Sequence, residues 1–113
     1  MVKIYHNKMC SKSRQTLELL QQKGQEVEVV EYLKNTPTED ELSDVLAKLN
    51  MKPEQLLRKG EKVYKENFAG QTHTDQEWIN IMVEHPVLIE RPIVVHGDKA
   101  VIGRPPENVL SIL

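Results

Sequence analysis

Residues 2–32, VKIYHNKMCSKSRQTLELLQQKGQEVEVVEY, decide the fold. Residues 2–5 alternate apolar and polar side chains and so predict a short strand, and residues 26–32 repeat that pattern. Between them, residues 11–23 are rich in helix formers, and Gly24 follows where a helix C-cap is expected. A strand, a helix of about 13 residues and a second strand form a βαβ unit. Its two strands should therefore be parallel, with a right-handed crossover.

The middle of the chain is predicted to be helical. The pairs Thr38 with Glu41 and Thr74 with Glu77 each have capping-box spacing, and apolar residues follow both pairs at helical intervals. Pro53 suits the start of a short helical turn. We therefore expect a helical segment here and not a linker.

The end of the chain returns to strands. Residues 93–96 and 99–102 flank Gly97 and Asp98, a pattern typical of a β-hairpin with a type II′ turn. A last helix should run from Pro105 to about residue 110. The order of elements predicts an α/β protein with a mixed four-stranded sheet, the first and last helices covering its faces. This is a thioredoxin-like fold with a helical insertion, and we expect residues 1–113 to form a single domain.

Composition excludes several classes of protein. The 113 residues are 39% hydrophobic and 28% charged, and the net charge of −2 is unlike that of a nucleic-acid binder. No apolar run approaches the ~20 residues that a membrane span needs, and the start of the chain has no secretory pattern. A single cysteine excludes an internal disulfide and a multi-cysteine metal site. The expected location is the cytoplasm, where thiols stay reduced.

Cys10 is the candidate nucleophile. Most lone cysteines are buried and inert, but this one comes directly before the first predicted helix. Helix N-termini carry partial positive charge, and Lys8, Lys12 and Arg14 add cations nearby. Both effects favour a thiolate and lower the pKa of a cysteine.

Three arginines are candidate oxyanion ligands. Arg58 precedes Lys59 and a glycine, Arg91 precedes Pro92, and Arg104 precedes a pair of prolines. An arginine side chain considered alone is more often exposed to solvent than bound to a ligand. If the three converge on Cys10, their planar forks would bind a small oxyanion. Base rates alone favour a trans peptide bond before Pro92.

Five segments, taken together, resemble the glutaredoxin-coupled arsenate reductases of the ArsC type, in order and over nearly the whole chain. The residues that carry the resemblance are Ile4, Tyr5, His6, Asn7, Cys10, Ser13, Arg14, Thr16 and Leu17; Tyr32, Leu33, Thr36, Pro37 and Thr38; Leu56, Leu57, Arg58 and Lys59; His85, Pro86, Leu88, Ile89, Arg91, Pro92, Ile93, Val94 and Val95; and Arg104 with Pro105. The chain departs from many members at Lys8, Ser11 and Lys12, and is similar to a shorter, chromosomal branch.

The resemblance implies a complete site. Cys10 would attack arsenate, or a similar oxyanion, held by Arg58, Arg91 and Arg104. His6 and Ser13 would support the thiolate, and Pro92 would be cis. Glutathione would be the co-substrate and glutaredoxin the partner, with arsenite as product and no tightly bound cofactor or metal. The protein would act as a monomer, without nucleic acid or membrane.

Two alternatives remain, while a third class is excluded. A phosphatase-like reductase needs Cys-x5-Arg, but Thr16 occupies that arginine position. A glutathione-dependent thiol-disulfide oxidoreductase of the same fold would match less well at Arg104. A regulator that binds RNA polymerase would usually carry Cys-x-x-Cys, whereas here Ser13 takes the second position.

Overall fold

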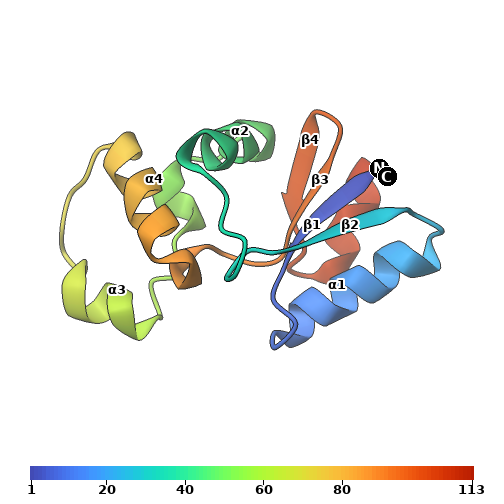
Figure 1. Cartoon of the computed structure of the whole chain (residues 1–113), viewed down its shortest axis with the longest axis horizontal. Coiled ribbons are helices and arrows are strands. Elements are labelled where there is room, and N and C mark those ends of the chain that lie inside the picture. Colours follow the sequence, from blue (N-terminus) through green and yellow to red (C-terminus); the bar gives the residue numbers. More distant parts are fainter. The chain divides into compact units, whose positions relative to one another are not determined.

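A four-stranded sheet with the order β2-β1-β3-β4 organises the fold, as the computed structural model of residues 1–113 shows (Figure 1). Strand β1 lies parallel to β2 and antiparallel to β3, and β4 pairs antiparallel with β3. The strands are β1 (Val2–His6), β2 (Val27–Glu31), β3 (Ile93–His96) and β4 (Lys99–Ile102). The predicted mixed sheet and the thioredoxin-like fold are therefore confirmed.

Helix α1 (Ser11–Gln22) makes the crossover between β1 and β2. It ends one residue before the predicted boundary, and Gly24 follows it at φ +74°. This left-handed conformation costs glycine little, so the chain can turn sharply into β2. Gly97, at φ +64°, has the same role between β3 and β4.

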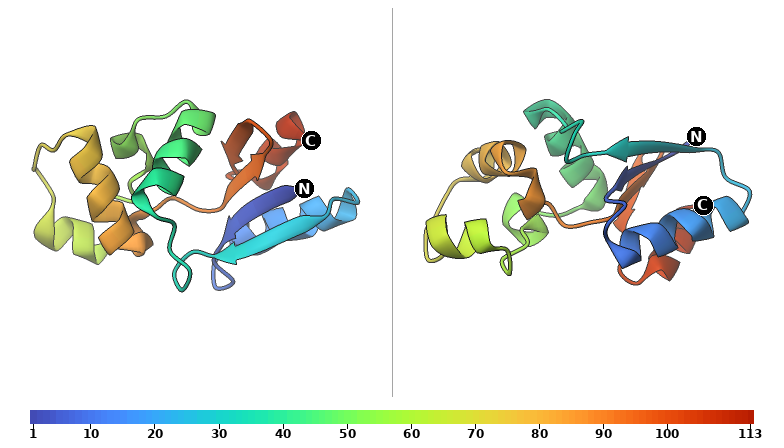
Figure 2. Two further views of the ribbon diagram at one scale, coloured as in Figure 1. Left: turned by 45° about the horizontal axis from the view of Figure 1, so that its top comes forward. Right: turned by 60° about the horizontal axis from the view of Figure 1, so that its bottom comes forward.

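Both terminal helical elements pack on one face of the sheet, in contrast to the expectation that they cover its two faces. Val2 and Ile4 point to the same side of β1, and Leu20 of α1 and Val109 of the last helix join them in one buried cluster. Helix α1 also contacts the last helix directly, and Figure 2 shows the two side by side. The apolar face of the sheet is continuous, and α1 and the last helix cover it together.

The last helix also differs from its prediction in kind. It is a 3-10 helix, η3 (Pro106–Ile112), and not an α-helix that starts at Pro105. Pro106 occupies the first helical position, where the missing N–H group costs nothing.

The segment between β2 and β3 forms a compact unit of its own, Thr36–Glu90, while Met1–Asn35 and Arg91–Leu113 form the other. The inserted unit is helical, as predicted. Its elements are α2 (Glu39–Leu49), η1 (Pro53–Leu56), α3 (Lys62–Asn67), α4 (Asp75–Glu84) and η2 (Pro86–Leu88). The short helix α3, which buries no residue, was not predicted. That residues 1–113 are a single domain stays a prediction.

Both predicted capping boxes are present in the inserted unit. Thr38 accepts a hydrogen bond from the Glu41 backbone, and Thr74 accepts one from the Glu77 backbone. Each glutamate side chain accepts a hydrogen bond from its threonine's N–H group in return. These bonds satisfy donors that a helix start leaves unpaired. No helix of the structure has the length and apolar character to cross a membrane.

Candidate active site

Cys10 occupies the N-cap of α1, at the end of the loop that leaves β1. Its side chain is buried, with 8% of its surface exposed. The Cys10 amide donates to the carbonyl of Asn7 at 3.0 Å, and the Cys10 carbonyl accepts from the amide of Arg14 at 3.0 Å. The backbone of Cys10 is therefore held by hydrogen bonds on both sides, and its side chain lies at the helix N-terminus, which favours negative charge.

Further bonds tie this loop to the first turn of α1. Arg14 Nη1 donates to the Lys8 carbonyl at 2.9 Å. Asn7 Oδ1 accepts from the amide of Met9 at 3.0 Å, which forms a local turn. Sequence reasoning assigned no such role to Asn7 or Arg14, although asparagine before a helix start is a recognisable turn signal.

His6 and Ser13 meet beneath the loop. His6 Nδ1 lies 2.6 Å from Ser13 Oγ, and both residues are buried. Burial lowers the pKa of His6, the Glu31 carboxylate opposes this, and Arg14 lowers that pKa further. Since Ser13 Oγ also accepts from the Asn7 amide at 3.1 Å, we assign its proton to a bond with the neutral His6 Nδ1. Through Ser13, which bonds both His6 and the Asn7 amide, the two residues hold the loop that precedes Cys10.

Arg104 reaches the sulfur from the end of β4. Its Nη2 donates to Cys10 Sγ at 3.3 Å, and its Nε donates to the Arg91 carbonyl at 2.7 Å. The second bond holds the guanidinium in place, while the side chain stays largely exposed. An exposed cation beside a thiol is accessible to an anion from solvent.

The pKa of Cys10 is lowered, although burial alone raises it. The Ser13 N–H group, the Arg91 guanidinium and the Lys12 N–H group each favour the thiolate and together outweigh the effect of burial. The amides act on the sulfur without forming a standard capping bond. The structure thus brings Cys10, Arg91 and Arg104 together, with His6 and Ser13 in support.

The peptide bond between Arg91 and Pro92 is cis, the isomer that the family resemblance implied and base rates disfavoured. The bond between Arg104 and Pro105 is cis as well, which no sequence argument anticipated. Two of the three candidate arginines therefore immediately precede a cis proline.

Arg58 lies in the inserted unit, where two carboxylates hold it. Leu57 and Ile89 form an antiparallel bridge, and the Arg58 amide donates to the Leu88 carbonyl at 2.8 Å. Arg58 Nη1 lies 2.5 Å from Glu90, and Nε lies 3.3 Å from Glu61. Burial lowers the pKa of Arg58, but Glu90 and Glu61 more than compensate and raise it. The convergence of Arg58 with Cys10 stays a prediction, and the two carboxylates were not foreseen.

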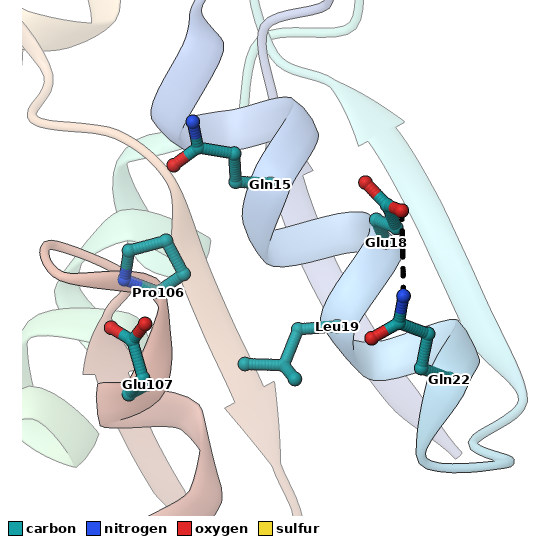
Figure 3. Close-up of a pocket in the computed structure, with 6 residues that line it drawn as sticks. All are labelled: Gln15, Glu18, Leu19, Gln22, Pro106 and Glu107. Atoms are coloured by element: carbon teal, nitrogen blue, oxygen red, sulfur yellow. Dashed lines mark hydrogen bonds between the residues drawn. The ribbon is translucent and has the colours of Figure 1, made fainter.

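A cavity of about 320 Å³ lies elsewhere, between α1 and η3 (Figure 3). Its lining holds two carboxylates and no cation: Gln15, Glu18, Leu19, Gln22, Pro106 and Glu107. Such a lining repels an oxyanion, so the cavity does not compete with the Cys10 site. No three side chains of the types that ligate metals gather anywhere in the structure.

The sequence matches the model of the ArsC family over residues 5–112. The chain belongs to the ArsC family. An arsenate reductase from Haemophilus influenzae is 45% identical over 112 residues, which cover 97% of each chain. A protein from Escherichia coli (strain K12), called Uncharacterized protein YfgD, is 50% identical over 99% of this chain and 96% of its own length.

A solved structure shares the ArsC architecture. The arsenate reductase from Vibrio cholerae superposes on this chain with a TM-score of 0.95 at 45% identity, covering 99% of this chain and 97% of the other. The family and fold inferred from the sequence are therefore confirmed. The roles that the ArsC resemblance implies for individual residues stay predictions.

Proposed function

We propose that this ArsC-family protein reduces arsenate to arsenite, with the Cys10 thiolate as nucleophile. The contact of Arg104 with Cys10 Sγ at 3.3 Å carries the proposal. A guanidinium at that distance favours the thiolate and is positioned to bind an oxygen of the anion under attack. The names of relatives at 40–45% identity support the choice of arsenate.

The reaction begins at the sulfur. The Cys10 thiolate forms a bond to arsenic, and one arsenic oxygen leaves as water. Arg91 and Arg104 hold the remaining oxygens and offset the charge that builds up on them. We also propose Arg58 as a third arsenate ligand, because the resemblance to the ArsC family implies this role.

The two electrons must come from external thiols, because the chain has only one cysteine. Glutathione condenses on the arsenic adduct, and a second water leaves. A glutaredoxin thiolate then attacks the glutathione sulfur, and the electron pair of the broken sulfur–arsenic bond stays on arsenic, which becomes As(III). Water hydrolyses the bond from Cys10 to As(III), which releases arsenite and restores the thiol. We place this cycle in the cytoplasm, where both thiols stay reduced.

A coupled assay tests the proposal. The purified protein is mixed with arsenate, glutathione, glutaredoxin, glutathione reductase and NADPH, and NADPH oxidation is followed. We expect arsenate-dependent turnover that Cys10→Ser abolishes and Arg104→Ala weakens, while circular dichroism shows both variants folded. Turnover of a glutathione mixed disulfide, with none of arsenate, would assign the protein to the thiol-disulfide oxidoreductases instead.

A further inference from the structure

Gly103, directly before Arg104, occupies a position with no room for a side chain. A Cβ atom built there would lie 2.6 Å from Thr16 Oγ1, 2.9 Å from Thr16 Cγ2 and 2.9 Å from Pro92 Cγ. Ordinary van der Waals contact begins near 3.4 Å. The backbone of Gly103 is not in the left-handed region, so close packing and not conformational freedom explains the glycine.

Hydrogen bonds hold Gly103 from two sides. Its amide donates to the Pro92 carbonyl at 2.9 Å. Its carbonyl lies 3.2 Å from Thr16 Oγ1, which also lies 2.8 Å from the Lys12 carbonyl and shares its single proton between the two. Thr16 is fully buried on α1. The end of β4 is thus clamped between α1 and the start of β3.

The contacts of Gly103 with Thr16 and Pro92 determine the backbone position of Arg104, the next residue in the chain. From that point Arg104 reaches the Arg91 carbonyl at 2.7 Å and Cys10 Sγ at 3.3 Å. Cys10 and Thr16 belong to the same helix, because Cys10 caps α1 and Thr16 lies within it. One rigid helix therefore carries both the nucleophile and the surface against which Gly103 rests.

We propose that Gly103 and Thr16 are positioning residues that set the distance from Arg104 to Cys10. This inference deepens the proposed function, and its consequences for arsenate turnover rest on that function. A side chain at position 103 moves the Arg104 backbone away from α1 and opens the contact with the sulfur. Hydrogen bonds weaken steeply with distance, and displacements of about 1 Å at a reacting centre can cost about 10²-fold in rate.

Three variants test the proposal: Gly103→Ala, Thr16→Ala and the double variant. Two readouts use no arsenate, namely the thiolate absorbance titration of Cys10 and the rate of its alkylation by iodoacetamide. We expect Gly103→Ala to raise the pKa of Cys10 by about one unit, which moves the pH midpoint of alkylation up by the same amount and slows alkylation at pH values below the wild-type midpoint about tenfold. Thr16→Ala removes two of the three close contacts and leaves the one with Pro92, so adding Gly103→Ala to Thr16→Ala should raise the pKa of Cys10 by clearly less than it does in the wild type.

Gly60→Ala is the matched control, since a Cβ atom there meets nothing within 4 Å. It should leave the Cys10 titration unchanged. A folded Gly103→Ala protein with the wild-type pKa of Cys10 overturns the proposal. If Gly103→Ala fails to fold, the double variant decides: a folded protein whose Cys10 pKa lies less than about one unit above that of Thr16→Ala supports the proposal, and a larger shift or a failure to fold refutes it.

Arsenate kinetics separate this inference from the proposed function. In an active enzyme, Gly103→Ala should lower kcat/KM for arsenate about as much as it slows alkylation, and the double variant should recover. A wild-type protein without arsenate turnover refutes the proposed function. The titrations of Cys10 still decide whether Gly103 and Thr16 set the position of Arg104.

Discussion

Arg104 donates a hydrogen bond from Nη2 to Cys10 Sγ at 3.3 Å, although 94 residues separate the two in the chain. The guanidinium places a positive charge and a hydrogen-bond donor beside the sulfur, and both favour the thiolate. Its second bond, to the Arg91 carbonyl, links the two arginines that flank the sulfur.

Arg104→Ala should raise the pKa of Cys10, because the sulfur then loses a hydrogen bond and a neighbouring positive charge. The rate of iodoacetamide alkylation, measured against pH, should reach its midpoint at a higher pH than in the wild type. Arg104→Lys should give an intermediate midpoint, since it keeps the charge without the fixed fork. Lys99→Ala removes an exposed cation from the same hairpin and serves as the control. Equal midpoints for Arg104→Ala and Lys99→Ala would refute the assignment.

His6 should make the protein less stable in mild acid. Its folded-state pKa lies below the ordinary value of 6.5, mainly because of burial. Between the two values the unfolded chain binds a proton that the folded chain does not, so stability falls as pH drops below about 6.5. Urea unfolding at pH 7.5 and at successively lower pH should show this loss, and His6→Asn should reduce it. An identical pH dependence in both proteins would contradict the prediction.

Glu90→Gln should improve arsenate binding under the proposed function. Glu90 lies 2.5 Å from Arg58 Nη1 and so competes with an oxyanion for the guanidinium. Removing its charge leaves Arg58 paired with Glu61 but lowers the competition for its Nη1 group, and we expect KM for arsenate to fall severalfold. Glu54→Gln is the control, because Glu54 pairs with exposed Lys59 at 3.7 Å and not with Arg58. A rise in KM for Glu90→Gln would show instead that the carboxylate holds Arg58 in its working position.

Thr74→Ala should destabilise the inserted unit by about 1 kcal/mol, the usual effect of losing an N-cap side chain. The change removes the acceptor for the Glu77 amide at the start of α4, a helix that buries Trp78 and Met82. Urea unfolding followed by tryptophan fluorescence measures the change. Thr74→Ser should keep most of the stability, and Thr72→Ala, two residues earlier in exposed coil, should keep all of it. A loss of equal size in Thr72→Ala would point away from the cap.

Sequence reasoning succeeded where the signal is local. The strands, α1 and both capping boxes follow from residues close together in the chain. It failed for α3, which has no buried residue and hence no apolar periodicity, and for η3, whose geometry follows from its packing against α1 and β4. Within the candidate site, Cys10 was predicted as the nucleophile from its position before a helix. Support of the thiolate by His6 and Ser13 was expected only by resemblance to the ArsC family, and the hydrogen bond between these two residues was not foreseen.

The sequence by itself determined the order of the predicted strands and helices and the presence of a single thiol. Periodicity, caps and composition are properties of neighbouring residues, so they can be recognised without a fold. Only the tertiary structure decided that α1 and η3 share one face of the sheet, that Arg104 reaches Cys10, and that Gly103 rests against Thr16. Those contacts join the two ends of the chain, and their distances depend on how side chains fill a common space.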